Sequence, residues 1–437
     1  MKLIFPLLLL AQFTMAQPVK DHTYPVSKEI VSPMHKTDFN NGNSCPERKQ
    51  GGNPRMVNGY LVFNGSMDGD RQVDPQIAVG GGYILEGSNR GLLIYTKEGK
   101  WVNGVSQNCF NNGIDPKMFF DIHDRVFVFD MWWYYDKPKT KPVNIAVSES
   151  SDPTLGWNIY PVSRTEEEDG GAIGYSRKWI GYSYPGGEQN TFIIRMADAK
   201  AGKPATIYHF KGSLGLPVFT QDPLDDLYFV DIDSADLTIT KIMDGQSGDP
   251  YAVLVSKTKH GLTYIDYPPS SPQKGTKQVV ASGDRNPKNL VIQNGYLWFS
   301  QTVLSHGRSA VQWNQVELKT GKFKQSGILR SDTSSFIQTS IAVNKRNDVL
   351  VGFQETNERM FVSPRFAYRS GKDKPSTIRK MVSIGEGESA TNGESWGDYS
   401  GSILDGDNLL DLWSIQSRAN AKGKAESVIV KVPGVHK

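Results

Sequence analysis

The stretch DPKMFFDIHDRVFVFD, residues 115–130, decides the fold class. A Pro-bearing entry leads into an extended segment, a polar turn follows, and the second strand is rich in aromatic and β-branched residues. This order recurs seven times between Asp74 and Gln416. The second strands are GYILEG (82–87), DRVFVFD (124–130), KWIGYSY (178–184), DDLYFVD (225–231), NGYLWFS (294–300), NDVLVGF (347–353) and NLLDLWS (408–414). Repeats of roughly 40 to 70 residues with little helical periodicity predict a β-propeller, in which each repeat forms one four-stranded blade.

Length and composition agree with a single all-β domain. The 437 residues include 43 Gly and 24 Pro, which suits many short strands joined by turns. We therefore predict a seven-bladed propeller of four-stranded antiparallel blades over residues 56–437, preceded by an extension at 18–55. Pairing of MVNGYLVFNG (56–65) with the last strand, ESVIVKVPG (426–434), would close the ring and remove two open sheet edges.

The first 17 residues have the layout of a secretory signal peptide. One Lys precedes an apolar run, and small residues surround Ala16, so we expect cleavage near Gln17 and a secreted or periplasmic monomer. The only cysteines, Cys45 and Cys109, are expected to form a disulfide in that oxidising environment, the alternative being two free thiols. The net charge of +3 gives no electrostatic case for nucleic acid, and no later segment is apolar for long enough to span a membrane.

In a propeller, the innermost strand of each blade starts at one face, which we call the entry face. Loops between blades and loops after second strands share this face, and the aromatic, amide and acidic residues among them form a candidate sugar-binding surface. For 395–405 a packing role is as well supported as binding, and an entry aspartate such as Asp74 or Asp115 more often satisfies backbone amides. The predicted substrate-binding residues are Trp132, Trp133, Tyr134, Trp396, Asp398, Tyr399 and Gln338.

A second set of entry-face residues is predicted to be catalytic. The loop SQTVLSHGRSA (300–310) places His306 two residues from Arg308, so a titratable imidazole lies beside a permanent cation. Tyr184 follows a second strand, and Arg285 stands in a blade entry. A single His is more often a bystander than a catalyst. Another histidine, His123, falls in a turn on the opposite face and is expected to be a polar turn residue.

Several catalytic and cofactor motifs are absent from the sequence. There is no G-x-S-x-G elbow, H-E-x-x-H motif, Walker loop or dinucleotide fingerprint. We therefore expect no cofactor and no metal centre. The acidic run at 166–169 is most simply a solvated loop, with Ca²⁺ binding as a weaker alternative.

The turn SSDPTLGW (150–157) resembles a degenerate Asp box, with Ser150, Asp152 and Trp157 in place. Together with IDPKMFFDIHDRVFVF, NIAVSESSDPTLGWNIY and SWGDYSGSILDGDNLLDLWSIQ, it resembles secreted bacterial seven-bladed propellers of the sialidase-like and BNR-type group over most of residues 70–431. That group includes polysaccharide lyases, among them ulvan lyases, as well as glycosidases and proteins without known activity. In the lyases a Tyr or His removes the C5 proton of a uronic acid, and Arg or His neutralises its carboxylate.

The leading hypothesis is therefore a secreted enzyme that cleaves uronate-containing polysaccharide or oligosaccharide by β-elimination. His306 or Tyr184 would transfer the proton, and Arg308 or Arg285 would neutralise the carboxylate. A second hypothesis is a propeller without catalytic activity that binds glycan or protein through the aromatic residues. A third is glycoside hydrolysis by two carboxylates drawn from Asp74, Asp115 and Asp398.

Overall fold

The computed structural model describes residues 24–36, 50–67, 74–89, 91–106, 113–133, 142–163, 170–184, 191–262, 267–283, 286–391, 396 and 398–434, excepting the side chains at 113–114 and 132–133. Within these ranges the chain is built from β-strands, with one short helix, α1 (Met196–Ala201). No helix in the same ranges is long and apolar enough to cross a membrane. The predicted all-β class is confirmed.

The described strands form six hydrogen-bonded sheets. One four-stranded sheet contains β5 (Gln76–Gly80), β6 (Tyr83–Ser88), β7 (Gly91–Thr96) and β8 (Trp101–Ser106). A second contains β17 (Leu216–Pro217), β19 (Leu227–Ile232), β20 (Asp236–Asp244) and β21 (Pro250–Lys259). A third contains β26 (Ser335–Val343), β27 (Val349–Asn357), β28 (Met360–Arg369) and β29 (Val382–Ser383). One five-stranded sheet contains β9 (Gly113–Asp121), β10 (Val126–Trp133), β11 (Val143–Ser148), β12 (Trp157–Val162) and β2 (Met34–Lys36). The other contains β30 (Gly401–Leu404), β31 (Leu412–Ala419), β32 (Ala425–Val432), β4 (Tyr60–Met67) and β3 (Gly52–Val57).

The sixth sheet joins two antiparallel units. One unit contains β13 (Ala172–Tyr175), β14 (Trp179–Ser183), β15 (Thr191–Arg195), β16 (Ala205–Phe210) and β1 (Val26–Val31), and the other contains β22 (Leu290–Gln293), β23 (Tyr296–Ser305), β24 (Arg308–Glu317) and β25 (Phe323–Leu329). Between them lies β18 (Phe219–Thr220), which pairs in parallel with β13 and with β22. Because this bridge is so short, the two units keep the geometry of separate antiparallel meanders.

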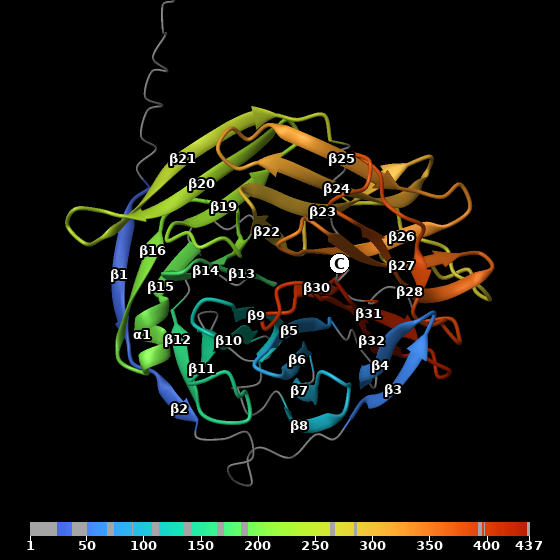
Figure 1. Ribbon diagram of the computed structural model, residues 1–437, viewed down its shortest axis with the longest axis horizontal. Coiled ribbons are helices and arrows are strands. Elements are labelled where there is room, and N and C mark those ends of the chain that lie inside the picture. Colours follow the sequence, from blue (N-terminus) through green and yellow to red (C-terminus); the bar gives the residue numbers. More distant parts are fainter. Residues whose placement is uncertain are drawn as a thin grey trace, which may run out of the picture.

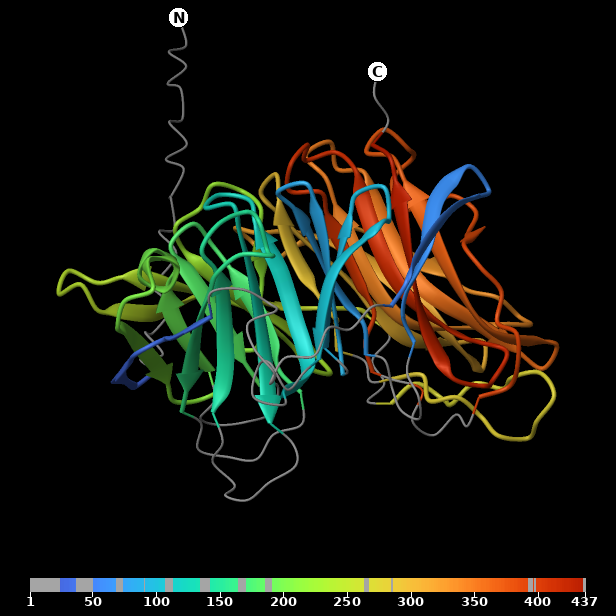
Figure 2. The ribbon, with the colours of Figure 1, turned by 90° about the horizontal axis from the view of Figure 1, so that it is seen from below.

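The sheets are arranged around a central axis, as in a β-propeller (Figure 1). In each antiparallel unit the strand nearest the axis comes first in the sequence, apart from the N-terminal strands, which lie outside. Each first strand starts at the entry face, where the connection containing 267–283 also lies, drawn in yellow at the bottom of Figure 2. The short turns after the first strands lie at the opposite face, which we call the turn face.

The N-terminal strands hold the ring together at its rim. β4 pairs with β32, with Val62 opposite Val430, so the predicted closure of the last sheet by an N-terminal strand is confirmed. The buried carboxylate of Glu86 on β6 strengthens this junction. It accepts hydrogen bonds from the backbone N–H of Ser66 at 2.9 Å, the hydroxyl of Ser427 at 2.6 Å and the hydroxyl of Tyr95 at 3.0 Å. The first sheet is therefore tied to both strands of the closure.

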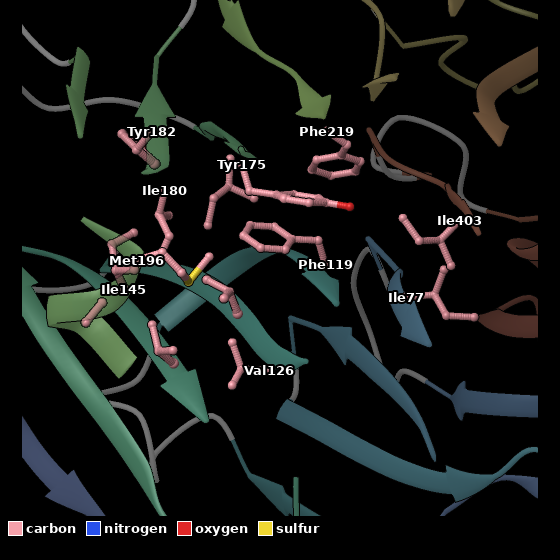
Figure 3. Close-up of a cluster of buried hydrophobic side chains, with 14 of the residues drawn as sticks. Ile77, Phe119, Val126, Ile145, Tyr175, Ile180, Tyr182, Met196, Phe219 and Ile403 are labelled. Atoms are coloured by element: carbon pink, nitrogen blue, oxygen red, sulfur yellow. The ribbon is translucent and has the colours of Figure 1, made fainter. Parts of the chain in front are cut away.

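Aromatic side chains from three neighbouring inner strands pack against one another close to the axis. The ring of Phe119 stacks on Tyr175 with centroids 4.5 Å apart, and Phe219 lies 5.7 Å from Phe119. Ile77 and Ile403 approach the same group from the first and last sheets (Figure 3). All five side chains are buried, so this part of the axis is filled by apolar side chains.

The Asp-box-like turn has a structural role. β11 and β12 pair from Val143 to Val162, and the turn between them lies at the turn face, as predicted. The carboxylate of Asp152 accepts hydrogen bonds from the backbone N–H of Thr154 at 2.9 Å and from its hydroxyl at 2.7 Å. The buried Trp157 donates its indole N–H to the carbonyl oxygen of Pro153 at 3.0 Å. These bonds satisfy the turn's own groups and leave it no evident part in ligand binding.

Candidate functional site

A hollow lies among the beginnings of the inner strands. Its polar lining comes from Gln76 on β5, Lys117 on β9, and Lys288 and Asn289 just before β22, and its apolar lining includes Ile173 and Phe219. Phe219 also belongs to the apolar group that fills the axis, so this group forms part of the wall of the hollow. The hollow therefore combines two ammonium groups with an apolar surface.

A repeated Asp-Pro pair sets the backbone on one side of the hollow. Asp74 and Asp115 each precede a proline, and two residues later stand Gln76 and Lys117, both of which line the hollow. Both aspartates have positive φ, 43° for Asp74 and 50° for Asp115. This conformation is uncommon outside glycine, although Asp and Asn tolerate it better than most residues. The same Asp-Pro conformation thus precedes the side-chain amide of Gln76 in one repeat and the ammonium group of Lys117 in the next.

Hydrogen bonds fix the two aspartates to neighbouring elements. The carboxylate of Asp74 accepts the backbone N–H of Asp398 at 2.7 Å and the side-chain amide of Asn89 at 2.8 Å. The amide oxygen of Asn89 in turn accepts the backbone N–H of Asp115 at 2.7 Å. The first, second and last sheets are therefore linked beside the hollow. These contacts support the predicted structural role for Asp74, whose carboxylate accepts a backbone N–H, whereas Asp115 takes part through its own backbone N–H.

Burial makes these carboxyl groups unusual. The pKa of Asp74 is raised well above its ordinary value by burial, and also by the negative charges of Asp115 and Asp398. Burial raises the pKa of Asp130 to about 7, despite the nearby Lys117. One carboxylate oxygen of Asp130 accepts the backbone N–H of Lys117 at 2.7 Å, and the other has no hydrogen-bond partner among the described residues. Protonation relieves the cost of burying such a charge.

The ammonium group of Lys117 is the most distinctive feature of the cluster. Lys117 is only 6% exposed, and burial lowers its pKa. Its Nζ lies 3.1 Å from the centroid of the Tyr399 ring and donates a long hydrogen bond, 3.5 Å, to the carbonyl oxygen of Asp115. In the part of the chain that the structure describes, no carboxylate lies within ion-pair distance of this Nζ. The negative charges of Asp115, Asp130 and Asp74 act on this ammonium group from beyond ion-pair distance.

Tyr399 is half-buried, and two cations lie close to its ring. The Nζ of Lys288 lies 5.2 Å from the centroid of its ring, in addition to the closer Lys117. Its hydroxyl sits against Gly170, where φ is 81° and a Cβ atom would collide with it. Asp398, the preceding residue, is exposed. Two of the predicted substrate-binding residues, Tyr399 and Asp398, therefore lie in this axial cluster, which we define as Asp74, Asp115, Lys117, Asp130, Lys288, Asp398 and Tyr399.

The other predicted binding residues lie elsewhere. Trp396 is 2% exposed, packs with Val280 and Ile337, and hydrogen-bonds to the side chain of Gln354, so its surroundings are those of a packing residue. Gln338 is buried with φ of 53° and packs against Gly283. The backbones of Trp132 and Trp133 end β10 opposite 114 and 113, but their side chains lie outside the described residues, as does Tyr134.

Two of the predicted catalytic residues, His306 and Arg308, contact residues outside the axial cluster. His306 lies in the tight turn between β23 and β24, where its ring nitrogens contact Asp332 at 3.0 Å and Arg330 at 3.2 Å. Arg308 donates to Glu358 at 2.8 Å. We call this group the β23–β24 hairpin cluster. Tyr184 directly follows β14 and is half-buried. Arg285, Cys45, Cys109 and the acidic run at 166–169 lie outside the described residues.

Sequence reasoning missed Lys117, Asp130 and Lys288. A usable signal existed for two of them, because Lys117 follows the second Asp-Pro pair and Asp130 is the lone acid in the apolar strand VFVFDMWW. His123 was correctly placed in a turn, and its ring contacts the carbonyl oxygen of Thr220 at 3.2 Å.

The chemistry open to the axial cluster is proton transfer and charge stabilisation. Carboxyl groups of raised pKa, a phenol and two ammonium groups can hold or move a proton and bind an anion. Over the described ranges, no group of three or more His, Cys, Asp or Glu side chains is arranged to hold a metal ion.

Comparisons with known proteins are distant. No protein-family model matches the chain, and no curated protein matches it. Among solved structures, a polysaccharide lyase of family PL25, an ulvan lyase, is 10% identical with a TM-score of 0.42, covering 85% of this chain and 95% of that one. AztD from Citrobacter koseri is 12% identical with a TM-score of 0.34, covering 83% and 96%. The GH93 α-L-arabinofuranosidase of Fusarium graminearum is 9% identical with a TM-score of 0.28, covering 70% and 89%. Similarity at this level carries no argument about activity, which must come from the site.

Proposed function

We propose that this protein is a carbohydrate-active propeller that cleaves uronate-containing polysaccharide or oligosaccharide by β-elimination at the axial cluster. The observation that carries the proposal is the buried ammonium group of Lys117, which lines the hollow without a carboxylate at ion-pair distance in the described chain. An anionic group of the substrate can form the direct ion pair with this ammonium group that the nearby Asp115, Asp130 and Asp74 do not form. The apolar wall around Ile173 and Phe219 suits the C–H face of a sugar ring.

Elimination at a uronate needs two things that the cluster offers. The C5 proton leaves to a base, the C4–O4 bond breaks, a C4=C5 double bond forms, and the departing oxygen takes a proton. The carboxylate at C5 must be neutralised so that negative charge can develop beside it, a role for Lys117 with Lys288 nearby. Tyr399 is the candidate proton-transfer group, because it carries a phenol and its ring centroid lies 3.1 Å from the Nζ of Lys117 and 5.2 Å from that of Lys288.

The β23–β24 hairpin cluster is the rival location for the same reaction. His306 and Arg308 stay within this proposal as the alternative base and neutralising cation, with Tyr184 and Arg285 as further members of that set. The contacts of His306 with Asp332 and of Arg308 with Glu358 count against these two residues, since each already has an acidic partner. Substitution of one residue from each location distinguishes the two.

Hydrolysis is the second candidate function. It is favoured by one observation: the pKa of Asp74 is raised by burial and by two neighbouring carboxylates, Asp115 and Asp398. A protonated carboxyl beside an ionised one is the arrangement that glycosidases use for acid and base.

The architecture we propose has seven blades in one domain over residues 56–437. The ten-stranded sheet then counts as two blades divided at β18, and the other five sheets count as one blade each. We further propose a cleaved leader at 1–17, export from the cytoplasm, a Cys45–Cys109 disulfide and a glycan partner. Mass spectrometry of the exported protein, with and without reduction, tests the leader and the disulfide together.

The deciding experiment mixes the purified protein with acidic and neutral polysaccharides and their oligosaccharides, and follows absorbance in the ultraviolet band of unsaturated uronates. A rise on uronate substrates alone is the expected result. New reducing ends without absorbance would establish hydrolysis instead. Saturable binding with neither product would identify a binding propeller and overturn the enzymatic proposal.

A further inference from the structure

We propose that an anion binds the axial cluster together with one proton, which Asp130 takes up, so that Asp130 governs whether Lys117 is available to the ligand. This inference rests on the proposed function, because it concerns the same hollow and the same anionic group. It adds Asp130, which does not line the hollow. It also predicts that anion binding depends on pH through proton uptake, which a simple anion site would not show.

Asp130 and Lys117 face each other across two strands. They form a directly opposed pair between β10 and β9, so their side chains project from the same face of the sheet. Opposed acid and base side chains usually form an ion pair. Here the carboxylate instead accepts the backbone N–H of Lys117 at 2.7 Å, and its second oxygen is buried without a partner in the described chain. The ammonium group points to the ring of Tyr399.

This arrangement is the one expected when Asp130 is neutral. A neutral carboxyl does not attract the ammonium group, which then stays over the ring of Tyr399. An ionised Asp130 would compete with a carboxylate ligand, because each could form an ion pair with the ammonium group of Lys117. Burial raises the pKa of Asp130 to about 7, so the exchange between the two forms falls near neutral pH.

The charges around Asp130 favour a proton when an anion arrives. Asp115 and Lys117 lie on β9, Asp74 precedes β5, Asp398 and Tyr399 precede β30, and Lys288 precedes β22, while β11 places the uncharged Ile145 opposite Asp130. Carboxyl groups thus outnumber ammonium groups before any ligand binds. An added anion raises the cost of each ionised carboxylate, and a proton on Asp130 removes one of them.

Asp130 and Asp74 both have raised pKa values, but they differ in how their oxygens are bonded. Both oxygens of Asp74 already accept hydrogen bonds, from Asp398 and Asn89, and such bonds stabilise the charged form. Asp130 has one oxygen without a hydrogen-bond partner among the described residues, and this oxygen can carry the proton. The balance is one anion and one proton bound together, with no bond made or broken.

Isothermal titration calorimetry of the full chain tests this inference, using D-glucuronate as the probe and D-glucose as the neutral control. Titrations at pH 8 in imidazole and in Tris, which differ in ionisation enthalpy, give the number of protons bound. We expect close to one proton per glucuronate, and an affinity that falls about tenfold per pH unit above pH 7. Glucose binding, if measurable, carries no proton.

Two variants separate Asp130 from other buried acids. Asp130→Asn mimics the neutral carboxyl, so proton uptake should vanish and affinity should stay constant from pH 6 to pH 8.5. Asp121→Asn is the matched control, because Asp121 is also buried with a pKa raised to about 7 but lies at the other end of β9. That variant should keep the wild-type proton uptake.

Each outcome decides between the two proposals. Glucuronate binding without proton uptake by the wild type, or uptake unchanged in Asp130→Asn, overturns the inference and leaves the proposed anion site standing. No glucuronate binding between pH 5.5 and pH 8.5 overturns both. The wild-type proton count needs no variant, so a failure of Asp130→Asn to fold does not remove the test.

Discussion

The axial cluster and the β23–β24 hairpin cluster both hold cations beside acids near the entry face, yet their surroundings are opposite. The side chain of His306 is 54% exposed and lies 3.0 Å from Asp332, whereas Lys117 is 6% exposed and has no carboxylate at ion-pair distance in the described chain. An exposed pair is stabilised by water and by its partner, and it gains little from a ligand. A buried unpaired cation gains much more. The proposed chemistry is therefore assigned to the buried cluster rather than to the exposed His306 and Arg308.

The largest effect is expected at Tyr399. Tyr399→Phe removes the proton-transfer group while keeping the ring under Lys117, so turnover should fall by about 10² to 10⁴-fold with little change in KM. His306→Ala is the paired variant. Loss of activity in His306→Ala together with full activity in Tyr399→Phe would move the active site to the hairpin cluster.

The next effect is expected at Lys117. Replacing it by Gln keeps much of its volume and removes the charge that meets the substrate anion, so kcat/KM on acidic oligosaccharide should fall by about 10² to 10³-fold. The exposed Lys319→Gln variant controls for the change in net charge and should retain wild-type rates. Equal losses in both variants would show that only long-range attraction is involved.

Buried and exposed acids should also differ in their effect on stability. Asp121 has a folded-state pKa of about 7, raised by burial, against an ordinary value of 3.8. Its favourable contribution is complete below pH 4 and is lost as pH rises through about 7. Asp121→Asn should therefore match the wild type at pH 4 and exceed its free energy of unfolding at pH 8 by about 2 to 4 kcal/mol in urea titrations. Asp332→Asn, which removes an exposed acid of lowered pKa, should show no such gain.

The smallest effect is expected from the exposed ion pair between Arg308 and Glu358. Their contact of 2.8 Å involves an acid whose side chain is 58% exposed. A double-mutant cycle on the free energy of unfolding, with Arg308→Ala and Glu358→Ala, should give a coupling energy below about 1 kcal/mol. A coupling of several kcal/mol would mean that the hairpin cluster is more strongly organised than its exposure implies.

The residue pattern within each strand made the fold predictable from the sequence. The site was harder to predict, because it depends on the pairing register between neighbouring strands. Each second strand, such as DRVFVFD, carries its own β-forming signal, so the all-β ring and the closure by the N-terminal strand could be inferred. Asp398 and Tyr399 stood out because they share one entry segment. The pairing of Asp130 with Lys117 needs the exact alignment of β9 with β10, which no local pattern encodes. Trp396 is buried against the segment around Val280, which is distant in sequence. The residues next to Trp396 in the sequence do not indicate this contact.

The N-terminal strands restrict how this ring can change over evolutionary time. β1 pairs with β16, β2 with β12, and β4 with β32, so one short stretch of chain fastens three separate sheets at the rim. Repeat proteins commonly gain or lose units by duplication. Here, a duplicated or deleted unit among those that carry β12 and β16 would leave β1 or β2 opposite the wrong partner. Changes in repeat number are therefore expected to be tolerated best between β17 and β29, where no described strand pairs directly with β1, β2, β3 or β4.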